Sequence, residues 1–410
     1  MKLFQINVVV NTGSTGRIAE ELGKLALKKG WESHIAVGRS PYMSDSKVVK
    51  VGGRLNMYKH LLETRLFDNH GFSSKQATIQ LIENIRKINP DIVHLHNLHG
   101  YYVHVGLLFQ FLSTYNKPVV WTLHDCWAFT GHCAFYEFVN CKKWQTECYN
   151  CPQTQEYPKS LYRDNSRRNF RLKKDSFNSV ANMTLVPVSN WLGDELKQSF
   201  LNAYPVKRIY NGVDLSLFNP SQRVNSPALR EKLEGKFLII GVANLWEEKR
   251  KGLQDFLQLS ELLAEDELII LVGLNKKLLS RLPSNVVGIE RTENPRDLAA
   301  LYATSNVFFN PTWEDNFPTT NLEALACGIP IITYKTGGSV EVITPDTGFS
   351  VDKGDLSEVL KALEAIKRNG KGYYMGKCSA YVADNFNKND RFQEYFMLYE
   401  AMLGTQDVDL

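Results

Sequence analysis

The stretch VFFNPTWEDNFPTTNLEALACGIPIITY, residues 307–334, decides the fold of this chain. It opens with an apolar run, Val307 to Asn310, that has the length and composition of a buried strand. A polar loop and a helical pattern follow, and the helix is expected to stop at Gly328 and Pro330. A second apolar run, Ile329 to Tyr334, comes next. This order predicts a βαβ unit, whose two strands belong to one parallel sheet.

The same alternation of short apolar runs and longer helical patterns extends along the chain in both directions from this unit. It fills the first half and then starts over, which predicts an α/β fold of two Rossmann-like, doubly wound domains. The expected strands are Leu3 to Val10, His34 to Val37, Ile92 to Leu95, Val119 to Leu123 and Leu185 to Val188 in the first half, and Phe237 to Val242, Glu267 to Val272, Val286 to Ile289, Val307 to Asn310 and Ile329 to Tyr334 in the second.

The joint between the domains is expected at Ile209 to Asp214, which contains the turn signal Asn211-Gly212. A chain of 410 residues is too long for one compact core, and two domains are the simplest division. The predicted parts are residues 1–208 with a cysteine-rich insert at about 126–155, residues 209–388, and a C-terminal helical segment of residues 389–410. The last helix is expected to pack either on the first domain or in the core of the second.

Composition limits the partners that this chain can have. Charged residues make up 22% of the chain and its net charge is +4, too small to predict a nucleic-acid partner. No run of about 18 apolar residues exists, so no membrane-spanning helix is expected. Gln5 and Asn7 interrupt the first apolar run and no cleavage site follows, which favours a strand over a secretion signal. We therefore expect a cytoplasmic protein.

Residues near the start of the helix in the 307–334 unit have the chemistry to bind a nucleotide sugar. The first N–H groups of a helix and the hydroxyls of Thr319 and Thr320 suit a phosphate, and the carboxylates of Asp315 and Glu323 accept hydrogen bonds from sugar hydroxyls. A second interpretation needs no ligand. Thr320 and Glu323 also have the spacing of a capping box, and the residues alone favour that cap.

The same stretch resembles the donor site of the retaining glycosyltransferases of family 4. That signature places two acidic residues eight positions apart before a Leu-Glu-Ala-hydrophobic-Ala-x-Gly-x-Pro run. Here Asp315 takes the place of the usual Glu, and Glu314 is the alternative match. Further segments resemble the family in the expected order over nearly the whole chain. They are Gly13 to Gly16, Thr122 to Asp125, Val188 to Trp191, Ile209 to Asp214, Arg250 to Gly252 and Tyr334 to Gly338.

The resemblance implies a GT-B fold, with the two domains facing one another across a cleft, and retaining transfer from a UDP- or GDP-sugar without a catalytic metal or other cofactor. Its catalytic residues map to His124, Arg250, Lys251 and Asp315. Its donor-binding residues map to Gly13, Gly16, Arg291, Thr292, Asn316, Phe317, Pro318, Thr319, Thr320 and Glu323. His99, Tyr101 and Asp125, at strand ends of the first domain, are assigned to the acceptor.

Two features of the first domain leave alternatives open. The cysteines Cys133, Cys141, Cys148 and Cys151 have the pattern C-x7-C-x6-C-x2-C, which suits either a structural zinc or free thiols. The basic segment Tyr162 to Lys174 suits either a solvated helix face or peripheral contact with an anionic membrane.

We therefore predict a glycosyltransferase that acts on a glycan or lipid-linked acceptor in bacterial surface polysaccharide synthesis, in the cytoplasm or at the inner membrane face. Nucleotide-sugar epimerases and sugar phosphorylases are alternatives on the same architecture. A third alternative is a binding module without catalysis, built around the cysteine-rich insert.

Overall fold

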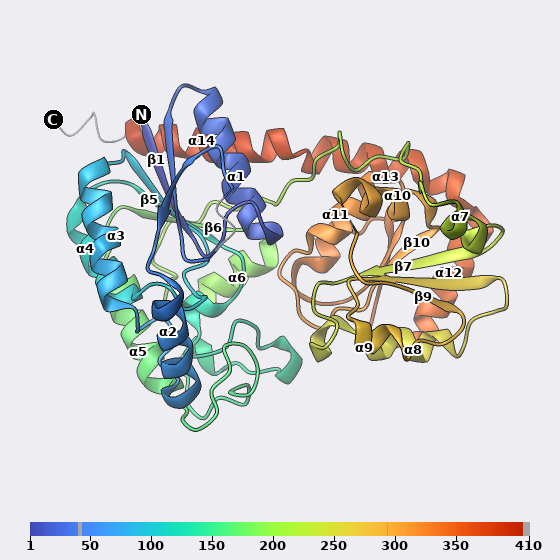
Figure 1. The fold of residues 1–410 in the computed structure, drawn as a ribbon, viewed down its shortest axis with the longest axis horizontal. Helices are drawn as coiled ribbons and strands as arrows, with labels where there is room; N and C mark the ends of the chain where they lie inside the picture. Colours follow the sequence, from blue (N-terminus) through green and yellow to red (C-terminus); the bar gives the residue numbers. More distant parts are fainter. Residues whose placement is uncertain (40–42, 293, 405–410) are drawn as a thin grey trace. The chain divides into compact units, whose positions relative to one another are not determined.

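The computed structural model describes residues 1–39, 43–292 and 294–404. The chain divides into two compact units (Figure 1). The first comprises Met1–Tyr210 together with the chain from Phe392 on, and the second comprises Asn211–Arg391. Each unit has its own six-stranded sheet. All strand pairs in both sheets are parallel, which confirms the predicted α/β fold of two doubly wound domains.

The first sheet has the strand order β3-β2-β1-β4-β5-β6. Its strands are β1 (Lys2–Asn7), β2 (Glu32–Val37), β3 (Lys47–Lys50), β4 (Ile92–Leu95), β5 (Val119–Leu123) and β6 (Met183–Pro187). The helices of this unit are α1 (Gly13–Lys28), α2 (Arg54–Phe67), α3 (Lys75–Ile88), α4 (Val105–Tyr115), α5 (Ser166–Phe177), α6 (Asn190–Gln198) and the 3₁₀ turns η1 (Trp127–Phe129), η2 (Glu137–Val139) and η3 (Lys143–Gln145). The inner strands β1, β4 and β5 are almost entirely buried, and the polar side chains of Gln5, Asn7 and His94 are buried with them.

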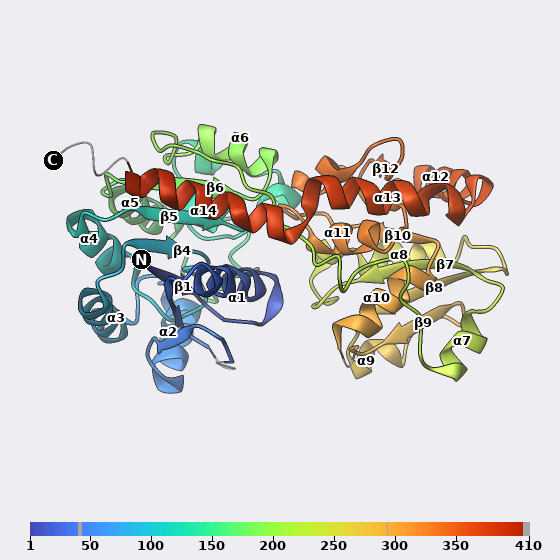
Figure 2. The same ribbon diagram turned by 90° about the horizontal axis from the view of Figure 1, so that it is seen from above.

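The last helix, α14 (Lys388–Gly404), runs from the second unit into the core of the first. Phe392, Tyr395, Phe396 and Tyr399 join one apolar cluster with α1 and with β1, β4, β5 and β6. Trp31 packs edge-on against the Phe396 ring at 5.2 Å between centroids. Figure 2 shows α14 alongside α1. Aromatic burial of this kind contributes several kcal/mol of stability to a core, roughly 2 or more per ring, so α14 is an integral layer of the first unit.

The second sheet has the order β12-β11-β10-β7-β8-β9. Its strands are β7 (Phe237–Val242), β8 (Glu267–Val272), β9 (Val286–Ile289), β10 (Val307–Asn310), β11 (Ile331–Tyr334) and β12 (Gly348–Val351). Its helices are α7 (Pro227–Leu233), α8 (Leu253–Ser260), α9 (Lys276–Leu279), α10 (Pro295–Thr304), α11 (Thr319–Ala326), α12 (Leu356–Asn369), α13 (Lys371–Phe386) and the 3₁₀ turns η4 (Lys249–Lys251) and η5 (Gly337–Val342). In both sheets the order reverses beside the first strand of the unit, and ligands of doubly wound sheets bind at such a switch point.

The strand predictions failed mainly at the sheet edges. β3 and β12, which the apolar pattern did not reveal, each lie at one edge of their sheet. β3 reads Lys-Val-Val-Lys and leaves its terminal lysines exposed, so it lacks the continuous apolar run of a strand covered on both faces. β1 ends at Asn7 rather than Val10, because the chain turns there toward α1. Among the described helices, none is long and apolar enough to span a bilayer.

Candidate active site

The βα turn that the sequence singled out lies between β10 and α11 in the second unit. Helix α11 begins at Thr319, with Pro318 in the N-cap position and no side chain bonded to the cap. The capping box predicted from Thr320 and Glu323 is therefore wrong, because Thr320 lies one position inside the helix and cannot cap it. The first N–H groups of α11 have no intrahelical partner and carry the positive end of the helix dipole.

The two acidic residues in this loop have different environments. Glu314 is 3% exposed, whereas Asp315 keeps 21% of its side chain exposed and lies at the surface. The Nζ of Lys251 lies 3.0 Å from Oδ2 of Asp315. Asp315 rather than Glu314 therefore presents a carboxylate beside a cation, as the preferred match to the family signature requires.

Lys251 and Arg250 belong to η4, which follows β7 and is fixed against the same loop. The backbone carbonyl of Arg250 accepts a hydrogen bond from the N–H of Trp313 at 2.8 Å. The Arg250 guanidinium donates to the carbonyl of Glu314 at 3.2 Å and pairs with Glu248 at 2.6 Å. The turn leaves η4 through Gly252, where a Cβ atom would come within 2.3 Å of the Pro311 carbonyl oxygen. The sequence therefore holds both cations next to the loop that carries Asp315.

Two glycines press η5 against the other side of this loop. Gly337 has φ +45°, and a Cβ atom there would come within 1.9 Å of the Asp315 carbonyl oxygen. The N–H of Gly338 donates to the carbonyl of Asn316 at 3.1 Å. Asn316, Phe317 and Pro318 are themselves buried, so their backbone forms a fixed wall rather than a mobile loop.

Glu323 lies one turn into α11, near the core. Its Oε2 accepts a hydrogen bond from the hydroxyl of Tyr302, which is fully buried, at 3.4 Å. Burial raises the pKa of Tyr302, so this hydroxyl keeps its proton and acts as a donor. Arg291 and Thr292 follow β9; Arg291 is exposed, Thr292 is half-buried, and no described contact joins either of them to Glu323 or Asp315.

In the first unit, the predicted glycine loop begins α1. Gly13 has φ +64°, and a Cβ atom there would meet nothing within 4 Å. Gly16 is close-packed, since a Cβ atom would meet a methyl group of Val9 at 3.1 Å. Its carbonyl oxygen accepts the N–H of Asn11 at 2.9 Å. The turn is therefore tightly packed at Gly16 and open on the side of Gly13.

A histidine cluster lies at the carboxyl ends of β4 and β5, in the same unit. The Nε2 of His124 lies 3.3 Å from Nδ1 of His96, and the two rings are stacked. Burial lowers the pKa of His124 to about 4, so its imidazole is neutral at pH 7. His94 turns away from this end: it bonds to Tyr399 and Thr122 inside the core, at 2.6 and 2.7 Å.

The acceptor candidates Asp125 and His99 form a hydrogen-bonded pair. Oδ2 of Asp125 lies 2.6 Å from Nε2 of His99, and the other ring nitrogen of His99 lies 2.8 Å from the hydroxyl of Tyr157. Tyr157 was missed by the sequence analysis, because it is 58 residues from His99 and no local motif marks it. Tyr101, with φ +70°, is 6% exposed and lies under the Arg39 guanidinium.

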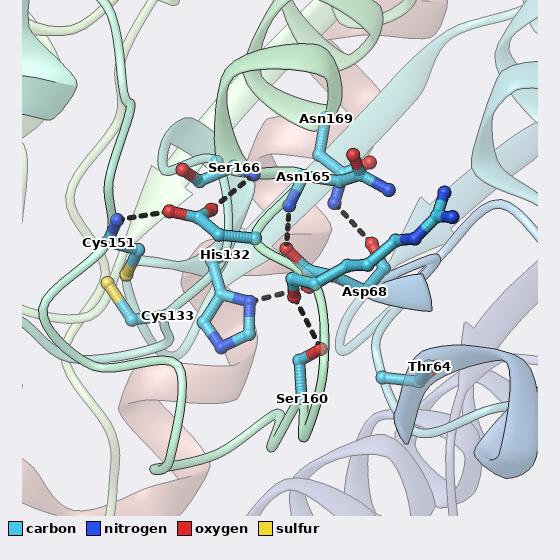
Figure 3. A network of polar contacts seen from close by, with 12 residues as sticks. Thr64, Asp68, His132, Cys133, Cys151, Ser160, Asn165, Ser166 and Asn169 are labelled. Carbon is cyan, nitrogen blue, oxygen red and sulfur yellow. Dashed lines mark hydrogen bonds and ion pairs between the residues drawn. The ribbon is translucent and has the colours of Figure 1, made fainter. Parts of the chain in front are cut away.

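The four cysteines of the insert do not assemble a metal site. Within the part of the chain that the structure describes, no group of three or more His, Cys, Asp or Glu residues could hold a metal ion, and all four thiols are free. Figure 3 shows the sulfur atoms of Cys133 and Cys151 near one another. The hydrogen bond from Cys133 lowers the pKa of the Cys151 thiol to about 7. The zinc alternative is therefore not supported, and free thiols are what the structure contains.

Polar contacts and buried rings fix the insert instead. His132 and Asp68, both fully buried, are 2.6 Å apart (Figure 3). Trp144 packs against the rings of Phe129 and Tyr136, at 5.1 and 5.0 Å between centroids. These contacts give the insert a core of its own.

The basic segment does not have the amphipathic face that a membrane helix needs. In α5, Phe170 and Phe177 are buried in the protein, and Lys173 is 1% exposed. Arg171 pairs with Glu147 at 2.5 Å. A helix that turns its apolar side inward has nothing apolar to insert in lipid, so α5 itself does not present the apolar face of an amphipathic membrane helix, and peripheral contact of the basic segment with an anionic membrane stays a prediction.

Comparisons with known proteins agree with the resemblance. Residues 15–217 match the model described as Glycosyltransferase Family 4, and residues 236–369 match the model described as Glycosyl transferases group 1. The chain is 26% identical over 378 residues to a putative colanic acid biosynthesis glycosyl transferase, WcaC, of Escherichia coli, covering 88% of this chain and 90% of that protein.

Two solved structures are similar over 98% of this chain. Sucrose-phosphate synthase from Thermosynechococcus elongatus has a TM-score of 0.72 at 17% identity, with 99% of its chain covered. Anabaena HepE in complex with UDP-glucose has a TM-score of 0.66 at 15% identity, with all of its chain (100%) covered. At this level of identity, the likeness shows the fold.

Proposed function

The chain belongs to glycosyltransferase family 4, and from this premise we propose that it transfers a sugar from a UDP- or GDP-sugar to a lipid-linked glycan in surface polysaccharide synthesis. It is a nucleotide-sugar-dependent, retaining glycosyltransferase. The relative named for colanic acid biosynthesis supports a polysaccharide product. The HepE complex with UDP-glucose supports a nucleoside diphosphate sugar as the donor.

One arrangement carries the proposed donor site: the uncapped start of α11 lies on the same loop as Asp315, beside Lys251 and Arg250. The bond between the sugar and the diphosphate breaks during transfer, and the leaving nucleoside diphosphate gains negative charge. Fixed cations and helix N–H groups stabilise charge that develops in this way. We assign the diphosphate to Lys251, Arg250 and the start of α11 at Thr319 and Thr320.

The remaining donor contacts follow from the positions of the other polar groups. Glu323 is assigned to the ribose, because its carboxylate is oriented by the buried Tyr302 hydroxyl. Asp315 and the wall of residues 316–318 are assigned to the sugar. Arg291 and Thr292 are assigned to the base. Gly13 and Gly16 are assigned to the donor because Gly13 leaves open space at the start of α1.

The first unit is assigned the acceptor. His124, neutral at pH 7, can donate or accept one hydrogen bond at a sugar hydroxyl. Asp125 and His99 are assigned to the acceptor hydroxyl, and Tyr101 lines the same end of the sheet. Asp125 fixes the orientation of the His99 ring from one side and Tyr157 from the other.

A thermal-shift screen with UDP, GDP and their sugars tests the donor assignment. A ligand that binds only the folded state raises the melting temperature by mass action. We expect a shift with one diphosphate nucleotide in the wild type and in Lys249→Ala, which removes an exposed neighbouring charge, and no shift in Lys251→Ala. No shift with any nucleotide would overturn the proposal. Product analysis then separates transfer from phosphorolysis, which requires inorganic phosphate.

A further inference from the structure

Helix α2, in the first unit, carries an apolar stripe on its exposed side. Its outer side exposes Leu55, Tyr58 and Leu62, which are 87%, 59% and 57% exposed. Its buried residues are His60 and Thr64, and both are hydrogen-bonded. A solvated helix normally does the opposite, and an exposed apolar stripe marks a surface that something covers. Both ribbon views place α2 at the periphery of its unit (Figures 1 and 2).

A second segment extends this stripe. The N–H of Leu161 donates to the carbonyl of Arg65 at 2.8 Å, which ties the segment to the end of α2. Leu161 and Tyr162 are 49% and 77% exposed. Phe67, the last residue of α2, is also exposed, and the Arg163 guanidinium lies over its ring at 5.6 Å. We name these six side chains the α2 surface: Leu55, Tyr58, Leu62, Phe67, Leu161 and Tyr162.

The residues around the α2 surface are strongly basic. Residues 54–75 and 159–175 together contain eleven Lys or Arg against four Asp or Glu, a net +7 in a chain whose net charge is +4. A cavity of about 750 Å³ opens beside α2, and Lys59, Lys75 and Arg168 contribute to its lining. Glu63 also lines it, and lies 3.9 Å from Lys59.

Several of these cations are available to an external anion. Among the described residues, no ion pair engages Arg54, Arg65, Lys75, Arg163 or Arg168. The α2 surface therefore combines exposed leucine and aromatic side chains with a rim of uncompensated positive charge, which is the composition of a peripheral membrane-binding site.

We propose that the α2 surface docks the protein on an anionic lipid bilayer. The six apolar side chains enter the interfacial region, and the surrounding Lys and Arg side chains contact lipid phosphates. Charge decides between a bilayer and a second copy of this chain, because self-association through this face would bring two strongly positive groups together, even when the buried Lys173 and the pairing of Arg167 and Arg171 with Glu147 are set aside. Docking would bring the enzyme to its acceptor only if that acceptor is lipid-linked, as proposed above. The docking itself is inferred independently of the acceptor.

Vesicle co-sedimentation without any nucleotide or acceptor tests the docking. The vesicles contain phosphatidylcholine alone, or with about 30% phosphatidylglycerol. We expect binding to the anionic vesicles only, weakened at least tenfold in about 0.5 M NaCl. The triple variant Leu55→Ser/Tyr58→Ser/Leu62→Ser should lose at least tenfold in affinity. The matched control Leu262→Ser/Met397→Ser, which removes apolar side chains that are 53% and 59% exposed elsewhere, should bind like the wild type.

Three results would overturn the proposal: equal binding to neutral and anionic vesicles, wild-type affinity in the triple variant, or light scattering that shows a dimer abolished by the triple variant. Because the replaced side chains are exposed, the triple variant should keep the wild-type melting temperature. The nucleotide-induced thermal shift is measured on the same variants. A wild-type protein that binds anionic vesicles but shows no nucleotide-induced shift would reject the donor site alone. A wild-type protein that shows the shift but does not bind anionic vesicles would reject the docking alone.

Discussion

Lys251 Nζ lies 3.0 Å from Asp315 Oδ2, so the proposed phosphate ligand and the proposed sugar ligand are paired with one another when no donor is bound. Both side chains are 21% exposed, which allows a ligand to reach them. A donor that takes the Lys251 ammonium into contact with its diphosphate leaves the Asp315 carboxylate available to a sugar hydroxyl. The two groups therefore respond to the donor together.

Lys251→Ala should reduce the rate of transfer about 100-fold or more, because it removes a cation from the leaving group. It should also weaken binding of the free nucleoside diphosphate, measured by titration calorimetry. Lys249→Ala changes the same net charge at an exposed neighbouring position and should leave both quantities within a factor of about two. Equal losses in the two variants would mean that only the general field of η4 matters.

Gly337→Ala should weaken donor binding, because the added methyl group would press on the Asp315 carbonyl oxygen and φ is +45° at this position. We expect a destabilisation of roughly 1–3 kcal/mol and displacement of the loop before α11. Gly376→Ala is the control. It lies inside α13 with nothing within 4 Å of its Cβ, so it should stabilise the protein by roughly 0.5–1 kcal/mol. If the Gly337→Ala protein kept wild-type nucleotide affinity, the loop before α11 would not contribute to donor binding.

Asp125→Asn should raise the KM for the acceptor and lower kcat by about 10- to 100-fold, because the His99 ring loses the carboxylate that orients it. The KM for the donor should not change. Tyr157→Phe should have a smaller effect in the same direction, since it removes only the other hydrogen bond to the His99 ring. Tyr149→Phe, in the neighbouring cysteine-rich insert, is the control. If hydrolysis of the donor by water fell as much as transfer did, the pair would act on the donor instead.

Acid should unfold the first unit before the second. All nine histidines lie between residues 34 and 132, in the first unit. Burial lowers the pKa of His60 to about 3 and that of His124 to about 4, and lowers the pKa of His70, His94 and His96 as well. Because these folded pKa values lie below the unfolded value of about 6.5, the unfolded chain binds more protons, and stability falls as the pH drops below about 6.5.

Each such histidine contributes a slope of up to about 1.4 kcal/mol per pH unit. His132 opposes this trend: burial acts to lower its pKa, but the hydrogen bond to Asp68 and the attraction of nearby negative charges, Asp68 first, together raise it. Calorimetry at pH 7.5 and about 5.5 should show the first-unit transition moving to lower temperature, while the transition that a nucleotide stabilises moves less. Equal shifts of both transitions would contradict this account.

The sequence predicted the interior of each sheet well, and its edges poorly. β4, β5, β7, β8 and β10, which lie inside the sheets, begin and end at the predicted residues, because strands buried on both faces are mostly apolar runs; the edge strand β9 was also predicted with its correct ends. β3 and β12 were not predicted, because an edge strand does not need a continuous apolar run. Thr320 would be an N-cap only if α11 began at Asn321, two residues after its actual start at Thr319, and a sequence pattern does not fix a helix start to within two residues.

Contacts that depend on distant parts of the chain were beyond a local pattern. The spacing of Phe170 and Phe177 is two turns of helix, and it marks a buried stripe of α5 as well as an amphipathic surface helix. Only the packed structure shows that this spacing belongs to a buried stripe. In α2, conversely, the apolar spacing of Leu55, Tyr58 and Leu62 is that of an ordinary core helix, and only the exposed fractions distinguish it from one.

The last helix has a consequence for biosynthesis. Phe392, Tyr395, Phe396, Tyr399 and Met402 complete an apolar cluster whose other buried members are encoded before residue 210. During translation, the core of the N-terminal unit therefore stays incomplete until the codons for residues 392–402 have been read. The second unit, Asn211–Arg391, can therefore complete its core before the first unit does. A premature stop before codon 392 would yield a chain with a completed second unit and a permanently unfinished first one.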